Sequence, residues 1–209
     1  MTSVHHMKPV RSKPTKTFND HKKYKSQLEK DFYKCCGYCD DHHGFSGGSK
    51  FFHVDHFAPK SKFKNEYSAY INDYNNLVYS CPYCNRHKSN KWLGKAPFEY
   101  VVNNKGFIDP CADEYDDHLF RNEDGSIGYS ENDDIGRYMY EELFLFLKRH
   151  QICYIMYQLN NKLEQLDELI EKKEQCGGEI PNDIHETLYM ALRRFRKYFG
   201  KYILEGEDM

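Results

Sequence analysis

Four cysteines have a spacing that suits one tetrahedral metal ion. Cys36 and Cys39 form one C-x-x-C turn, and Cys81 and Cys84 form a second. Each such turn presents two thiolates, and two turns complete the ligand set of a structural zinc ion. Because no position remains open to substrate, this zinc would stabilise the fold. Cys35 adjoins the first turn, so it is an alternative to Cys36 as a ligand.

Residues between and around the two cysteine pairs resemble the HNH nuclease family. The resemblance runs from Cys36 to Trp92. It depends on short fragments that are specific only in combination. These fragments are Asp55-His56 with Pro59, Asn76-Leu77, and Cys84-Asn85 with Lys88.

The resemblance implies a role for each of four residues. It makes His56 the general base, since a neutral imidazole can accept a proton from water near pH 7. It makes Asp55 and Asn85 the ligands of one catalytic Mg²⁺ or Mn²⁺ ion, because carboxylate and amide oxygens suit hard cations. Asn76 would be structural and would hold the loop that orients His56. Such a set hydrolyses phosphodiester bonds.

Two further histidines lie close to these positions. His53 is two residues from Asp55, so both side chains would project from one face of a strand. His53 is a supporting residue in this interpretation, with a ligand or phosphate contact as the alternative. His87 follows Asn85 and is interpreted as a supporting surface residue.

Charge is distributed unevenly along the chain. Residues 1–109 hold 18 Lys and Arg against 10 Asp and Glu, whereas residues 110–209 hold 12 against 22. A basic half is typical of proteins that bind nucleic acid. Arg86, Lys88 and Lys91 follow the second cysteine pair and are the predicted phosphate contacts. DNA is the expected substrate, and the same chemistry would cleave RNA.

The elements that must position these residues can be read from hydrophobic patterns. Residues 18–33 predict a helix with Asn19 or Asp20 as its N-cap. Residues 51–57 and 77–80 predict short strands, and residues 85–93 a helix or helical turn. Asp124-Gly125 predicts a hairpin turn. The resemblance implies that two antiparallel strands and one helix surround the catalytic metal, the ββα-metal arrangement.

Apolar residues recur at spacings of three and four from residue 135 onward. The pattern predicts one long amphipathic helix over residues 135–175, ended by Gly177-Gly178, and a second helix after Pro181. The predicted fold class is α+β: a ββα-metal core with a structural zinc site of four cysteines, followed by a C-terminal helical hairpin. The predicted boundaries are 1–30 for a basic arm, 31–109 for the nuclease domain, 110–134 for a connection and 135–209 for the helical domain.

The order of these parts resembles HNH proteins of bacterial anti-phage systems, in particular the PtuB-like nucleases of Septu and retron-associated systems. That resemblance implies an SMC-like ATPase as a partner protein. The helical hairpin would be its docking surface, and packing on the core or formation of a homodimer are the alternatives. The basic, polar N-terminus and the absence of long apolar runs predict a cytoplasmic protein without a membrane span.

A second candidate function is a non-catalytic zinc module that binds nucleic acid or bridges proteins. In that case Asp55, His56 and Asn85 would be incidental. Metal stoichiometry separates the two functions. The nuclease needs a weak divalent site besides the tight zinc, whereas the module needs only the zinc.

Overall fold

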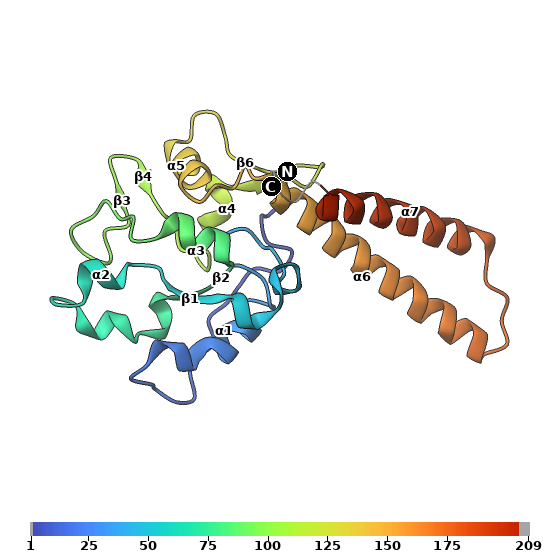
Figure 1. Ribbon diagram of the computed structural model, residues 1–209, viewed down its shortest axis with the longest axis horizontal. Helices are drawn as coiled ribbons and strands as arrows, with labels where there is room; N and C mark the ends of the chain where they lie inside the picture. Colours follow the sequence, from blue (N-terminus) through green and yellow to red (C-terminus); the bar gives the residue numbers. More distant parts are fainter. Residues whose placement is uncertain (1, 205–209) are drawn as a thin grey trace. The chain divides into compact units, whose positions relative to one another are not determined.

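The computed structural model describes residues 2–204, and the chain forms two compact units that divide between His150 and Gln151. The first unit contains small sheets and short helices, and the second is helical (Figure 1). This arrangement confirms the predicted α+β class and the helical C-terminal region. Among the described residues, no helix is both long and apolar enough to cross a membrane.

The centre of the first unit is a pair of antiparallel strands followed by a helix. β1 (His53–His56) pairs with β2 (Leu77–Ser80), with His53 opposite Ser80 and His56 opposite Leu77. All four residues of β2 are buried, which explains why its sequence is not alternating but almost entirely apolar. α3 (Pro82–Lys88) begins directly after β2. Its first residue is proline, whose fixed φ suits that position.

The N-terminal residues pack onto this centre. The predicted helix over residues 18–33 begins as a 3-10 turn, η1 (His21–Tyr24), and continues as α1 (Lys25–Asp31). Asp20 is the N-cap of η1, where its carboxylate accepts the Lys22 N–H at 3.0 Å. Leu28 of α1 is fully buried. Ahead of η1, residues 2–10 form no regular helix, residues 4–7 are bends, and Thr2 forms a β-bridge with Arg121.

The remaining elements of the first unit are short. The Asp124-Gly125 turn forms as predicted, with Gly125 at φ 84°, and joins two strands into a hairpin. Within residues 2–204 the strands form three two-stranded sheets: β1–β2, β3–β4 and β5–β6. The other elements before residue 130 are η2 (His43–Ser46), η3 (Ser49–Phe51), α2 (Lys60–Phe63), η4 (Ser68–Ile71), η5 (Tyr74–Asn76), β3 (Val101–Val102), β4 (Lys105–Gly106), α4 (Tyr115–His118), β5 (Phe120–Arg121) and β6 (Ile127–Gly128).

The prediction of one helix over residues 135–175 is wrong at its centre. α5 (Asp134–Glu142) ends before Leu143, and α6 (Lys148–Gln175) begins five residues later. Phe144 adopts a left-handed φ of 57° at the break. Leu143 and Leu145 are both buried there. Residues two apart lie on opposite sides of a helix, so only a broken helix lets both leucines reach the core.

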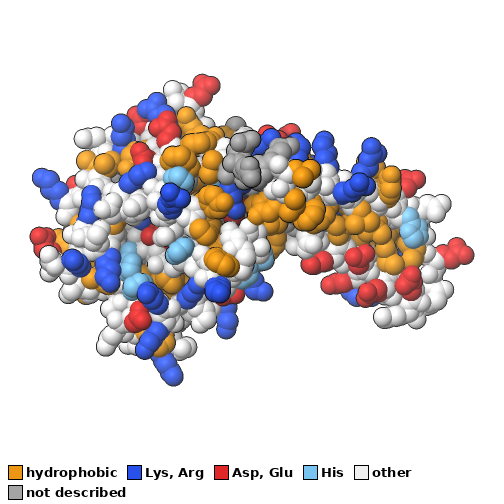
Figure 2. All heavy atoms as spheres, in the orientation of Figure 1, with side chains coloured by type: hydrophobic (Ala, Val, Ile, Leu, Met, Phe, Trp, Pro, Cys, Tyr) orange, Lys and Arg blue, Asp and Glu red, His pale blue; other side chains and the backbone are white. Residues whose placement is uncertain are grey.

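α6 and α7 (Asn182–Leu204) form the predicted hairpin, with α7 running back along α6 (Figure 1). Gly177, at φ 67°, lies in the connection after α6, and Pro181 immediately precedes α7. Apolar side chains gather on the facing sides of the two helices (Figure 2). They include Leu159 and Leu163 of α6 and Ala191 of α7, all of which are buried.

Candidate active site

The four predicted zinc ligands meet at one buried position. The sulfur atoms of Cys36, Cys39, Cys81 and Cys84 all lie within 4.8 Å of one another. The sulfurs of Cys39 and Cys81 are 3.8 Å apart. Four sulfurs from two C-x-x-C turns are the donor set of a structural zinc, so these residues fit that ion. Because Cys36 contributes to this cluster and Cys35 does not, the structure selects Cys36 between the two alternatives.

Local packing explains how the two turns reach one point. Gly37 separates the first two cysteines, and a Cβ there would lie 2.7 Å from both the Phe32 ring and a Val78 methyl. Only glycine lets this turn approach β2 so closely. Burial raises the pKa of the Cys39 and Cys84 thiols, so four thiolates need a bound cation.

Asp55 of β1 is held by two neighbours. The Tyr38 hydroxyl donates to Asp55 Oδ2 at 2.7 Å, and the Lys88 ammonium lies 3.0 Å from the same oxygen. Tyr38 lies between the first two cysteines, and Lys88 is the last residue of α3. The carboxylate is therefore fixed by the first cysteine turn on one side and by α3 on the other.

The expectation that Lys88 contacts phosphate on the surface is wrong. Its side chain is 0% exposed, and its ammonium also donates to the backbone carbonyl of His56 at 2.8 Å. A buried ammonium is tolerated only when it is paired and hydrogen-bonded, and Asp55 supplies that pairing. Lys88 thus positions two consecutive residues of β1.

His56 is buried, at 9% exposure, and one contact of its ring indicates which nitrogen carries the proton. Its Nε2 atom lies 2.9 Å from the backbone carbonyl of Ile71. Because a carbonyl can only accept, Nε2 carries the proton and Nδ1 keeps the lone pair in the neutral ring. Burial lowers the pKa of His56, and the nearby His21 and Lys60 lower it further, against the raising effects of Ile71 and Asp55. The imidazole is therefore neutral and able to accept a proton near pH 7.

Asn76 connects two parts of the chain that follow His56. Its Oδ1 accepts the Ala58 N–H at 2.7 Å, and its Nδ2 donates to the carbonyls of Ala58 and Tyr70. Tyr70 directly precedes Ile71, whose carbonyl orients the His56 ring. This placement is the one expected of a residue that holds the loop around the base.

The other predicted site residues lie around this centre with differing exposure. Asn85 is half-buried and lies three residues before Lys88, so the two residues are neighbours on one side of α3. Arg86 and His53 are exposed. Lys91 pairs with the Glu142 carboxylate at 2.5 Å. His87 stacks on the Phe144 ring with centroids 3.8 Å apart, so it supports the break before α6.

His21 is the main residue that the sequence analysis missed. It belongs to η1, and its ring lies 4.5 Å from the His56 ring, centroid to centroid. No spacing pattern links the two histidines, because they come from separate segments of the chain. Tyr38 was also missed, although its position inside the first cysteine turn was a usable signal.

Comparison with known proteins agrees with this geometry. The HNH endonuclease family matches residues 36–91. The chain is also 31% identical over 124 residues to the Septu protein PtuB of Bacillus mycoides (strain KBAB4), an alignment that covers 51% of this chain and 41% of that protein. The chain therefore spans about two fifths of the length of that relative. No solved structure matches the chain. Both cysteine turns, the β1–β2 pair and α3 all lie inside the matched range, so residues 36–91 match the HNH endonuclease family in a chain that is similar to PtuB.

Proposed function

We propose that this chain is a metal-dependent HNH endonuclease that hydrolyses phosphodiester bonds of DNA. The observation that carries the proposal is the state of His56. Its Nε2 proton is committed to the Ile71 carbonyl, and burial keeps the ring neutral, which leaves Nδ1 as a base.

Asp55 and Asn85 are the proposed ligands of the catalytic divalent ion. Tyr38 and Lys88 both bind the Asp55 carboxylate at Oδ2, so Oδ1 is the oxygen available to a metal. The amide oxygen of Asn85 completes an all-oxygen donor pair, which suits Mg²⁺ or Mn²⁺ better than zinc. A bound ion of this kind supplies positive charge at the phosphate and at the leaving oxygen.

The protein residues have separate tasks in this mechanism. His56 accepts the proton of the attacking water at Nδ1, while Ile71 prevents the ring from rotating. Lys88 and Tyr38 fix the Asp55 carboxylate. Asn76 holds the loop that contains Tyr70 and Ile71, so the base keeps its direction.

DNA is the proposed substrate because the first half of the chain is basic and an exposed lysine lies close to the proposed base. Arg86 on α3 and Lys60 after β1 are exposed, and Lys60 is close enough to His56 to lower its pKa. Such residues hold a phosphate backbone without reading its bases. Lys91 is a weaker candidate for this role because Glu142 already pairs with it.

A role in anti-phage defence, together with an ATPase partner, is the further part of the proposal. Its support is the similarity to a protein named Septu protein PtuB. The α6–α7 hairpin is the proposed partner surface, since it exposes large apolar side chains. These are Leu169, Tyr189, Met190, Leu192, Phe199, Ile203 and Leu204.

Plasmid cleavage tests the nuclease proposal. Supercoiled DNA is incubated with wild-type protein, His56→Ala or His53→Ala, each with Mg²⁺, Mn²⁺ or EDTA. We expect wild-type protein and His53→Ala to nick or linearise the plasmid only with metal. His53 is the matched comparison because it is an exposed histidine on the same strand, and retained cleavage by His53→Ala would also exclude it as a catalytic metal ligand.

The His56→Ala variant should be inactive while its zinc content is unchanged. Full cleavage by this variant would contradict the assignment of the base. If wild-type protein fails to cleave even when an SMC-like ATPase partner is added, the non-catalytic zinc module explains the data better than the nuclease.

A further inference from the structure

Two buried residues next to the first cysteine turn are not part of the four-cysteine cluster. Cys35 and Asp40 flank the turn, directly next to Cys36 and Cys39, and both are buried. Together with His6 they form a separate group whose ligand atoms lie within 4.8 Å of one another. We propose that His6, Cys35 and Asp40 bind a second zinc ion.

The chemistry and spacing of this group suit zinc. An imidazole nitrogen, a thiol and a carboxylate are all common zinc ligands. His6 Nδ1 lies 3.0 Å from Asp40 Oδ2. Two ligands of a tetrahedral zinc with bonds near 2.0 Å lie about 3.3 Å apart, so this pair is already close to the required separation. The three protein ligands leave a fourth position for water, and the His6 side chain, at 13% exposure, leaves a route to solvent.

Backbone contacts hold all three ligands in place. The His6 N–H donates to Asp40 Oδ2 at 2.9 Å, and Asp40 has a left-handed φ of 62°. That conformation is fixed by a hydrogen bond from the Asp40 N–H to the Cys36 carbonyl at 2.9 Å. Cys35 forms a β-bridge with His42. The group is therefore organised by the same turn that presents Cys36 and Cys39 to the first zinc site.

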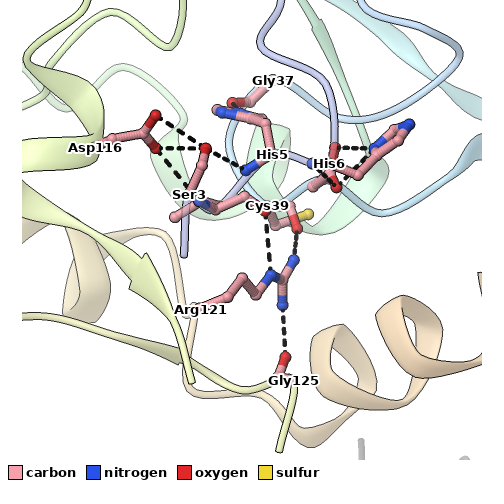
Figure 3. Close-up of polar contacts among 10 residues, drawn as sticks. Ser3, His5, His6, Gly37, Cys39, Asp116, Arg121 and Gly125 are labelled. Carbon is pink, nitrogen blue, oxygen red and sulfur yellow. Dashed lines mark hydrogen bonds and ion pairs between the residues drawn. The ribbon is translucent and has the colours of Figure 1, made fainter. Parts of the chain in front are cut away.

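The second zinc would attach the N-terminal segment to this turn. Figure 3 shows that segment passing over the turn, with Ser3 directed at Asp116 and His5 at the Gly37 carbonyl. The buried Arg121 connects the N-terminal segment to the turn, since its guanidinium donates to the carbonyls of Val4 and Cys39. A metal bond to His6 adds a stronger attachment at the next residue of the segment.

Zinc counting by mass spectrometry tests the proposal directly. Each protein is dialysed against excess zinc, freed of unbound metal and measured per chain. We expect wild-type protein to hold a second zinc ion beyond that of the four-cysteine site. Cys35→Ser and His6→Ala should each lose this second ion and keep the first, which also shows that they fold.

Matched variants make the assignment specific. His5→Ala removes another attachment of the same segment, and Cys111→Ser removes a cysteine outside both groups, so both should keep the second ion. Asp55→Asn should keep it too, which separates this site from the proposed catalytic one. A single zinc per wild-type chain, or a second zinc that survives in both Cys35→Ser and His6→Ala, would overturn the proposal. The count does not depend on cleavage, so its failure is distinct from failure of the nuclease proposal.

Discussion

A backbone carbonyl decides which nitrogen of His56 can act as a base. Ile71 accepts a hydrogen bond from Nε2, and this leaves Nδ1 with its lone pair. Burial lowers the pKa of His56 by disfavouring the charged ring, so the imidazole stays neutral. Neither influence is visible in the sequence around Asp55-His56, because Ile71 and the surrounding residues come from other segments.

The lowered pKa of His56 gives the pH dependence of cleavage. A protonated His56 cannot accept a proton, so the rate should rise with pH through the pKa of the base. We expect the midpoint of this acid limb below 6.5, the ordinary histidine value. In His21→Ala the loss of the neighbouring ring should raise the pKa of His56 and move the limb to higher pH.

Initial rates of plasmid nicking between about pH 5 and 8, measured with saturating Mg²⁺, check this expectation over the range where histidine titrates. His53→Ala is the control and should leave the limb unchanged, because His53 is exposed at the other end of β1. A midpoint above 6.5, or a limb that does not move in His21→Ala, would show that another group is titrating.

Because Lys88 is buried, it stabilises the fold by pairing with Asp55 and does not contact phosphate. Lys88→Met removes the positive partner and leaves the Asp55 carboxylate buried with only Tyr38 as a donor. Breaking a buried ion pair from one side costs about 3–5 kcal/mol, so the free energy of unfolding should fall by roughly that amount. Urea denaturation measures the change. Arg86→Met is the control on the same helix, and because Arg86 is exposed it should change stability by less than about 0.5 kcal/mol. An equal effect of both variants would contradict the pairing.

Among the elements of the first unit, the strands are short and form few backbone hydrogen bonds with each other. Side-chain hydrogen bonds therefore hold the connecting loops in place. β1 and β2 have four residues each, so the loop after β1 needs another anchor. Asn76 provides it through bonds to Ala58 and Tyr70. The orientation of the base therefore depends on an amide whose hydrogen bonds go to the surrounding loops and not to the base itself.

Asn76→Ala separates positioning from folding. Loss of its hydrogen bonds leaves buried backbone groups unpaired, which should destabilise the protein by about 1–3 kcal/mol. Because a small displacement of a catalytic group is costly, kcat should fall by up to ~100-fold. KM and zinc content should stay close to the wild-type values.

Steady-state cleavage kinetics and metal analysis provide the measurement for Asn76→Ala. The adjacent Asn75 is exposed, so Asn75→Ala is the matched control and should be nearly neutral. Unchanged kcat in Asn76→Ala would mean that Ile71 and the rest of the loop hold His56 without it.

The sequence pattern predicted some elements closely and others poorly. The helix expected over residues 85–93 is α3, which spans Pro82–Lys88 and ends five residues early. β2 has the predicted bounds, and the hairpin at Gly125 forms as expected, because local turn chemistry and apolar runs determine both. The spacing pattern also continues through Leu143–Leu147, where the structure breaks the helix. There the run contains adjacent apolar residues, and packing of Leu143 and Leu145 into the core overrides periodicity.

Considering the molecule as a whole, the four-cysteine cluster joins distant segments of the first unit. The cluster joins the turn after α1 to the start of α3, so one ion would connect segments more than forty residues apart. Structural zinc sites contribute about 10–16 kcal/mol, as much as or more than the ~5–15 kcal/mol stability of a typical domain.

We therefore expect zinc removal to unfold the first unit. Treatment with a strong zinc chelator, or the variant Cys84→Ser, should abolish the near-ultraviolet circular dichroism of the aromatic core. Cys176→Ser is the control, since Cys176 is exposed and lies outside the cluster. A chelated protein that kept its aromatic signal and its melting temperature would show that the core does not need the metal.

Local spacing along the chain already indicates the residue pairs that point to nuclease chemistry. The spacing of the cysteines and the fragments around Asp55, Asn76 and Asn85 are local, and turns and short strands translate such spacing directly into geometry. The environment of each residue follows from packing between distant segments: Cys36 and not Cys35 joins the four-cysteine cluster, Lys88 is buried, and His21 lies against His56. Burial and pairing arise from segments that are distant in the chain, and no local pattern encodes which of those segments will meet.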